Sequence, residues 1–206
     1  IVLGVGMGII SALLKGTLVD RAIVGSSLLF YAFPTFALGL GIYTFFALKW
    51  HWVPVPQYVT IADGGIGGWL QGLLLPSLTL ALVYIAGYVR LTRAFVLESM
   101  SEDYLRTARA KGLAPRKVLF KHTMRAALTP LVTVAGLDLG GLLGGAIITE
   151  QIFNYPGLGK LAVLSTQQYD LPIIVGIVIV AATFIIVANL IVDLLYAVID
   201  PRVKYA

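Results

Sequence analysis

Apolar runs longer than the roughly 18 to 20 residues that a helix needs to cross a bilayer are the feature that most constrains this chain. Hydrophobic residues make up 59% of the sequence and charged residues 12%, and the mean hydropathy is +0.93. A soluble core has no need of such runs, so the sequence predicts an integral membrane protein. Because backbone polar groups in lipid must be paired within their own segment, we interpret the runs as helices.

Five apolar segments can be placed, and the expected fold class is all-α: a polytopic helical bundle with about five membrane spans. The segments cover residues 1–14, 22–48, 73–97, 128–149 and 171–199. Pro34 and Pro76 are expected to kink or end helices within this pattern. The first segment, at about 1.5 Å per residue, is short for a hydrocarbon core of roughly 30 Å. The chain also begins with Ile1, so we expect at least one further span upstream.

Basic residues are concentrated between the third and fourth segments. Nine of the fifteen lysines and arginines lie between Arg90 and Arg125. If the loops alternate sides, thirteen basic residues lie on one side of the membrane and two, Lys49 and Lys160, on the other. The positive-inside rule places the first side, with the carboxyl terminus, in the cytoplasm. A basic excess of this kind indicates loop orientation, so we expect no nucleic-acid partner.

Metal and thiol chemistry are not indicated. The chain has no cysteine, and its two histidines, His51 and His122, are too few and too far apart to suggest a metal centre.

The cytoplasmic loop, residues 98–127, is expected to form two short helices around a turn at Gly112. Pro115 suits the first position of the second helix. Leu113 and Val118 have the spacing of a hydrophobic staple.

On the first helix of this loop, Tyr104, Leu105 and Ala108 share a face. The small residues Ala108 and Gly112, one turn apart, would let another surface approach closely. We therefore interpret the loop as a docking site for a soluble partner. The alternative is a basic loop that interacts only with anionic lipid.

The fourth span carries a glycine repeat and one ionisable group. Gly136, Gly140 and Gly144 recur every four residues and predict a small-residue face for helix packing. Asp138 lies in the same span, where a carboxyl group is costly and suggests a functional role. A pathway role and a structural pair with a neighbouring helix are equally open for Asp138.

The last span has a polar face toward its cytoplasmic end, formed by Asn189, Asp193, Tyr196 and Asp200. We interpret Asn189 and Asp193 as a structural or gating contact rather than a substrate site.

Two stretches are expected to lie outside. Residues 49–69 hold all three tryptophans together with prolines and glycines, which is typical of a loop at the headgroup level. The run Asn154-Tyr155-Pro156-Gly157 predicts a turn followed by a short helix.

Residues 103–130 resemble the cytoplasmic coupling loop, or EAA loop, of binding-protein-dependent ABC importer permeases. Three other stretches support the resemblance: "EQIFNYPGLGKL", "NLIVDLLYAVIDPR" and "VDRAIVGSSLLFYAFPTFALGL". The Pro-Gly-Leu-Gly turn and the terminal Asp-Pro-Arg are similar to the first of the two membrane subunits in the dipeptide, oligopeptide and nickel class. Within the loop, Arg106 and Thr107 stand where the broad pattern has Glu and its first Ala, and Ala108 stands at the second Ala.

The resemblance implies a type I ABC transporter transmembrane domain over residues 1–206, incomplete at its amino terminus, in a bacterial cytoplasmic membrane. Its partners would be a second permease subunit, two cytoplasmic ATPase subunits, an external substrate-binding protein and membrane lipid. This chain would be no enzyme and bind no cofactor or metal, because ATP and Mg would be bound by the ATPases. The resemblance assigns ATPase coupling to Asp103, Tyr104, Arg106, Ala108, Arg109, Lys111 and Gly112.

The implied function is import of dipeptides or oligopeptides, with a nickel-type importer as an alternative. Two other classes stay open from the residues: a secondary transporter or channel subunit, and a membrane scaffold that recruits cytoplasmic proteins. The loop discriminates among them, because a secondary transporter does not require it and a scaffold does not couple it to transport.

Overall fold

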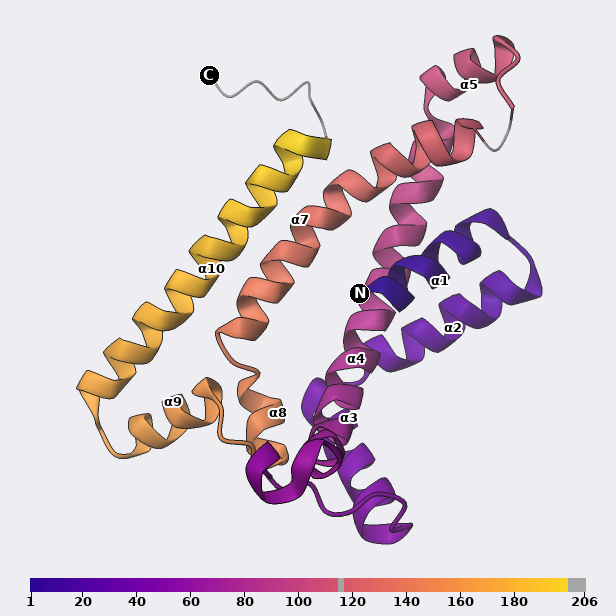
Figure 1. The fold of residues 1–206 in the computed structure, drawn as a ribbon. Helices are drawn as coiled ribbons and strands as arrows, with labels where there is room; N and C mark the ends of the chain where they lie inside the picture. The colour runs from indigo at the N-terminus through magenta and orange to yellow at the C-terminus, as the bar shows by residue number, and fades with distance from the viewer. Residues whose placement is uncertain (115–116, 200–206) are drawn as a thin grey trace. The chain divides into compact units, whose positions relative to one another are not determined.

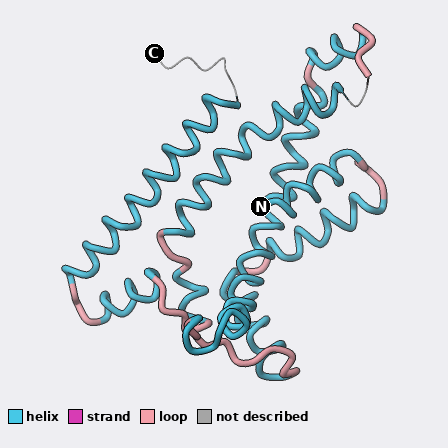
Figure 2. Tube along the Cα trace, in the orientation of Figure 1, coloured by secondary structure: helices cyan, strands magenta, loops and turns pink. Residues whose placement is uncertain are grey.

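The computed structural model describes residues 1–114 and 117–199, and the regular elements within them are all helical (Figures 1 and 2). The expected all-α membrane fold is therefore confirmed. The elements are α1 (Val2–Leu13), α2 (Leu18–Ala32), α3 (Thr35–Ile42), the π-helix η1 (Tyr43–Lys49), α4 (Ile61–Ser101), α5 (Asp103–Ala110), the π-helix η2 (Val118–Thr123), α7 (Met124–Leu143), α8 (Ile147–Ile152), α9 (Leu158–Gln167) and α10 (Leu171–Ile199).

Three helical segments in the described ranges are long and apolar enough to cross a membrane: Ile61–Ser101, Val118–Ile152 and Leu171–Leu194. A fourth is present if the bent pair Leu18–Ala32 and Thr35–Lys49, which meet at 98°, counts as one span. α1 is apolar but short, as expected from the short first apolar segment of the sequence. The last predicted segment coincides with α10.

Pro34 breaks the second predicted segment into α2 and α3. Its extended backbone (φ −57°, ψ 138°) lies at the amino-terminal cap of α3. Proline has no N–H to donate and disfavours helical geometry in the residue before it, so the helix stops and restarts at an angle. Pro76 instead lies inside α4, which continues past it.

The expectation of a loop over residues 49–69 is wrong in its second half, because α4 begins at Ile61. Thr60 provides the start signal: its Oγ1 accepts a hydrogen bond from the Asp63 backbone N–H at 3.2 Å and donates one to the Asp63 carboxylate at 2.5 Å. Gly65, with φ +64°, then bends the first turns. The glycines of this stretch led us to expect a loop, but most of them lie in the helix.

The chain divides into two compact units. The first contains residues 1–29, 84–138 and, among the described residues, 188–199; the second contains 30–83 and 139–187. The first unit has a buried cluster of Ala12, Val96, Met124 and Ala127. The second unit has a buried cluster formed by Ile42, Ala47, Leu75 and Phe153.

In the first unit, α1 packs closely on α4. A Cβ atom added to Gly4 would lie 2.6 Å from the Cβ of Tyr88, and one added to Gly8 would lie 2.6 Å from the Cβ of Thr92. Only glycine lets the two helix backbones approach this closely, which is a common way for membrane helices to associate.

Candidate functional site

The basic loop of residues 98–127, which the sequence predicts to be cytoplasmic, has a small apolar core of its own. Leu105 and Ala108 of α5 are buried against Val118 of η2, and Leu113 packs on the same cluster. Leu105 is fully buried. The predicted pairing of Leu113 with the second helical segment thus contributes to a folded loop rather than a flexible one.

Gly112 ends α5 as predicted. Its φ of +74° is a left-handed conformation, which favours glycine. The backbone N–H of Lys111 bonds the Thr107 carbonyl at 3.0 Å, and that of Leu113 bonds the Ala108 carbonyl at 3.3 Å. The chain therefore reverses at Gly112, with the carbonyls of Thr107 and Ala108 in the last turn satisfied.

The small side chain of Ala108 does not face outward as expected. It is 9% exposed and lies inside the loop, where it lets α5 and η2 approach each other. Gly112 is exposed, with open space where a Cβ would lie. The side chains of Arg106 and Arg109, and the whole of Pro115, lie outside the described residues.

Two aromatic side chains lie exposed on this loop. Tyr104 is 44% exposed and Phe120 is 65% exposed. Partial burial, and to a lesser degree the nearby Glu102 carboxylate, raises the pKa of Tyr104. Asp103 and Lys111 are exposed beside them. Phe120 was not singled out from the sequence, because the exposure of one apolar residue cannot be deduced in a loop without clear periodicity.

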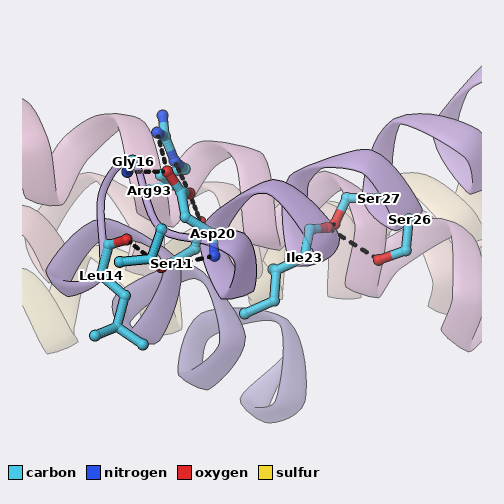
Figure 3. Close-up of polar contacts among 9 residues, drawn as sticks. Ser11, Leu14, Gly16, Asp20, Ile23, Ser26, Ser27 and Arg93 are labelled. Carbon is cyan, nitrogen blue, oxygen red and sulfur yellow. Dashed lines mark hydrogen bonds and ion pairs between the residues drawn. The ribbon is translucent and has the colours of Figure 1, made fainter.

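Asp20 forms a buried polar node that sequence reasoning missed (Figure 3). Its carboxylate accepts four hydrogen bonds, from Ser11 Oγ (2.6 Å), Gly16 N (2.8 Å), Arg93 Nε (2.9 Å) and Arg93 Nη2 (3.0 Å). Asp20 is 4% exposed. The node therefore joins α1, the turn after it and α2 to α4. The sequence did contain a signal for this node: Asp20 is the only acidic residue before Asp63, so it is a single carboxylate between two apolar segments.

A second polar contact between helices joins α4 and α7. The hydroxyl of Tyr88 donates a hydrogen bond to Oδ2 of Asp138 at 2.7 Å. Tyr88 is 1% exposed and Asp138 is half-buried. Tyr84 lies one helical turn before Tyr88 on α4 and is half-buried. Asp138 thus has a helix partner, and one of its carboxylate oxygens is engaged.

The glycine repeat of α7 lies along α10. A Cβ on Gly136 would clash with the Cγ2 atom of Val192, and one on Gly144 would lie 3.4 Å from the Cβ of Ala181. Gly140 is buried. On α10, Asn189 is half-buried and Asp193 is exposed. The side chain of Tyr196 and all of Asp200 lie outside the described residues.

Glu150 organises the connection between α7 and α10. Its Oε1 accepts a hydrogen bond from the Ala146 N–H at 3.0 Å, and its Oε2 accepts one from the Lys160 N–H at 2.8 Å. One carboxylate thereby satisfies amides at the starts of both α8 and α9. The predicted turn and short helix are confirmed as Asn154 at φ +53° followed by α9.

Glycines make room for this arrangement. A Cβ on Gly157 would collide with the Glu150 carboxylate, and one on Gly159 would lie 2.6 Å from the Cα of Ile147. The two glycines of the Pro-Gly-Leu-Gly run are therefore a steric requirement of the α8–α9 hairpin.

No group of three or more metal-binding side chains occurs within residues 1–114 and 117–199. This part of the chain contains a folded basic loop, two polar contacts between helices and a braced hairpin of α8 and α9.

Comparison with known proteins agrees with this picture. The chain is 40% identical over 205 residues to a probable peptide ABC transporter permease protein, y4tP, of Sinorhizobium fredii, covering 100% of this chain and 65% of that protein. It is 38% identical to the oligopeptide transport system permease protein AppB of Bacillus subtilis over 206 residues, again 100% of this chain and 65% of the relative. It is 37% identical to the dipeptide transport system permease protein DppB of Escherichia coli over 224 residues, with 98% and 66% covered.

The chain thus spans about 65% of the length of these relatives. Residues 4–205 match the family described as binding-protein-dependent transport system inner membrane component. The chain belongs to this family of binding-protein-dependent transport system inner membrane components.

Proposed function

We propose that this chain is a transmembrane permease subunit of an ATP-driven, binding-protein-dependent importer of dipeptides or oligopeptides. It contributes part of the translocation pathway and hydrolyses nothing itself. Its partners are a second permease subunit, two cytoplasmic ATPases that bind ATP and Mg, and an external substrate-binding protein. The membrane is the bacterial cytoplasmic membrane, with the carboxyl terminus in the cytoplasm. Family membership and the names of the peptide-transporting relatives support this proposal.

The observation that carries the coupling role is the folded loop at the end of α4. It has its own buried residue, Leu105, and it exposes two aromatic side chains, Tyr104 and Phe120. Aromatic side chains are enriched where protein surfaces bind each other. A loop that only attracts anionic lipid would need basic charge but no internal core.

Helix geometry explains how a displacement of the loop would reach the membrane. Glu102 alone separates α4 from α5, so the loop begins where the long helix ends. Arg93 ties α4 to Asp20, and Tyr88 ties it to Asp138 on α7. When ATP closes the ATPase pair, the docked loop moves with it, and these contacts carry the movement through the first unit. Binding-protein docking outside and ATP binding inside must favour the same state for transport to be coupled.

The test is purification of the tagged full-length subunit with its copurifying partners in lipid nanodiscs, followed by measurement of ATP hydrolysis with and without binding protein. We compare the wild type with Phe120→Ala in the loop and with Phe36→Ala, an exposed phenylalanine of α3, as the matched control. The expected result is an ATPase subunit in the wild-type and Phe36→Ala preparations and a large loss of bound ATPase or stimulated hydrolysis in Phe120→Ala. Transport driven by an ion gradient with no copurifying ATPase would overturn the proposal in favour of a secondary transporter.

A further inference from the structure

The two carboxylates that α4 contacts are satisfied to very different degrees. Asp20 accepts four hydrogen bonds, two of them from the guanidinium of Arg93. Among the described residues, Asp138 accepts one hydrogen bond, from the neutral hydroxyl of Tyr88. Asp20 therefore has the full set of partners of a structural carboxylate, whereas Asp138 does not.

A carboxylate within a membrane span needs a positive partner. Burial in a low-dielectric region is costly for an ionised group unless a cation or several donors compensate it. In the described part of the chain, the hydrogen-bond partner of Asp138 is the neutral hydroxyl of Tyr88, whereas the described ion pair joins Arg93 to Asp20. The half-buried position of Asp138 leaves it accessible to a group from outside the chain.

The groups around Asp138 match one cation chemistry in particular. A primary ammonium carries three N–H donors and no acceptor. Asp138 offers its second oxygen, and Tyr88 offers the lone pairs of the oxygen whose hydrogen is already donated. Tyr84, half-buried and four residues before Tyr88 on the same face of α4, adds a further phenolic oxygen and an aromatic ring. A metal ion fits less well, because no other His, Cys, Asp or Glu joins Asp138 in a described cluster of three.

We propose that Asp138, Tyr88 and Tyr84 form a subsite for the primary ammonium group at the amino terminus of a peptide. This proposal rests on the proposed function, since a peptide importer brings such an ammonium group into the membrane. Asp138 contacts the ammonium directly. Tyr88 is a positioning residue, because its hydrogen bond to Oδ2 holds the Asp138 carboxylate in place through one of its two oxygens. The contact is weak enough to be left again, as passage through a transporter demands.

The experiment uses the complete complex in nanodiscs without binding protein, so that only the membrane subunits present a peptide site. Trialanine and N-acetyl-trialanine are titrated by calorimetry up to millimolar concentration. The acetyl group removes the charge and leaves the rest of the peptide unchanged. The variants are Asp138→Asn and Tyr88→Phe, with Glu98→Gln, an exposed carboxylate on α4, as the matched control.

The wild type and Glu98→Gln are expected to bind trialanine at least about tenfold more tightly than the acetylated peptide, as for a hydrogen bond between charged groups. Asp138→Asn is expected to abolish this preference, and Tyr88→Phe to reduce it several-fold. If Asp138→Asn does not assemble, Tyr88→Phe, which keeps the ring and its packing, decides the result. Equal binding of the two peptides by the wild type, no measurable binding, or an unchanged preference in the assembled Asp138→Asn or Tyr88→Phe variants would overturn the subsite.

A parallel assay separates this outcome from a failure of the proposed function. ATP hydrolysis stimulated by binding protein is measured in the same preparations. If stimulation is present and the ammonium preference is absent, the importer function stands and the subsite falls. If stimulation is absent from the wild type, the proposed function itself fails.

Discussion

Arg93 holds Asp20 with two parallel hydrogen bonds, Nε to Oδ1 at 2.9 Å and Nη2 to Oδ2 at 3.0 Å. The side chain of Arg93 is 27% exposed, whereas that of Asp20 is 6% exposed. The two partners are therefore unequal. Removing Arg93 leaves the buried Asp20 carboxylate without its positive partner. Neutralising Asp20 leaves the Arg93 guanidinium, which still reaches a polar environment.

Arg93→Ala is accordingly expected to destabilise the protein by about 3 kcal/mol, and Asp20→Asn by clearly less, because the asparagine side chain still offers an oxygen to Ser11. Thermal unfolding of the purified complex in detergent measures both variants. Arg21→Ala, an exposed arginine beside the node, is the control. If Arg93→Ala unfolds at the same temperature as Arg21→Ala, the node does not contribute to stability.

Gly136→Ala is expected to destabilise the contact of α7 with α10 by about 1 to 3 kcal/mol, because the added methyl group would overlap Val192. Gly141→Ala, on the same helix with nothing within 4 Å of the added Cβ, should have little effect. Combining Gly136→Ala with Val192→Ala should restore part of the loss, because the clashing Cγ2 atom is then absent. Unfolding of the four proteins in one detergent checks this. Equal effects at Gly136 and Gly141 would contradict the packing.

Glu150→Ala is expected to loosen the α8–α9 hairpin, because the amides of Ala146 and Lys160 both lose their acceptor. Each lost hydrogen bond to a charged group contributes on the order of 1.5 to 3 kcal/mol. Glu150→Gln keeps one oxygen and should have a smaller effect. Hydrogen exchange of the two amides, followed by mass spectrometry, is the measurement, with the exposed neighbour substitution Gln151→Ala as the control. Unchanged exchange in Glu150→Ala would show that the carboxylate does not brace the hairpin.

The sequence predicted those parts of the fold that depend on local composition. α10 was placed to the residue, because a long apolar run in lipid can only be a helix. Gly112 was recognised as a helix end, because a left-handed turn there favours glycine. The start of α4 was missed, since its glycines are typical of loops and the cap at Thr60 is a single side chain.

The candidate site was predictable only where one segment determines it. The partner of Asp20 lies 73 residues away on another helix, a distance at which a single sequence carries no pairing information. The orientation of Ala108 was misjudged for a different reason. An apolar helix face shows the same spacing whether its own chain or a partner covers it, and here η2 covers it.

Leu105→Ala tests whether the loop after α4 is folded. Leu105 is fully buried against Ala108 and Val118 in the small core of that loop. The substitution leaves a cavity in a very small core, so we expect the loop to open locally while the membrane helices keep their stability. Tyr104→Phe, at the exposed neighbour, removes only a hydroxyl and is the control. Hydrogen exchange should rise at the amides of Lys111 and Leu113, whose hydrogen bonds close the turn at Gly112. The thermal unfolding midpoint of the whole protein should change little. If exchange at these amides is the same in Leu105→Ala and Tyr104→Phe, the cluster does not hold the loop, and a rigid coupling element cannot be built on it.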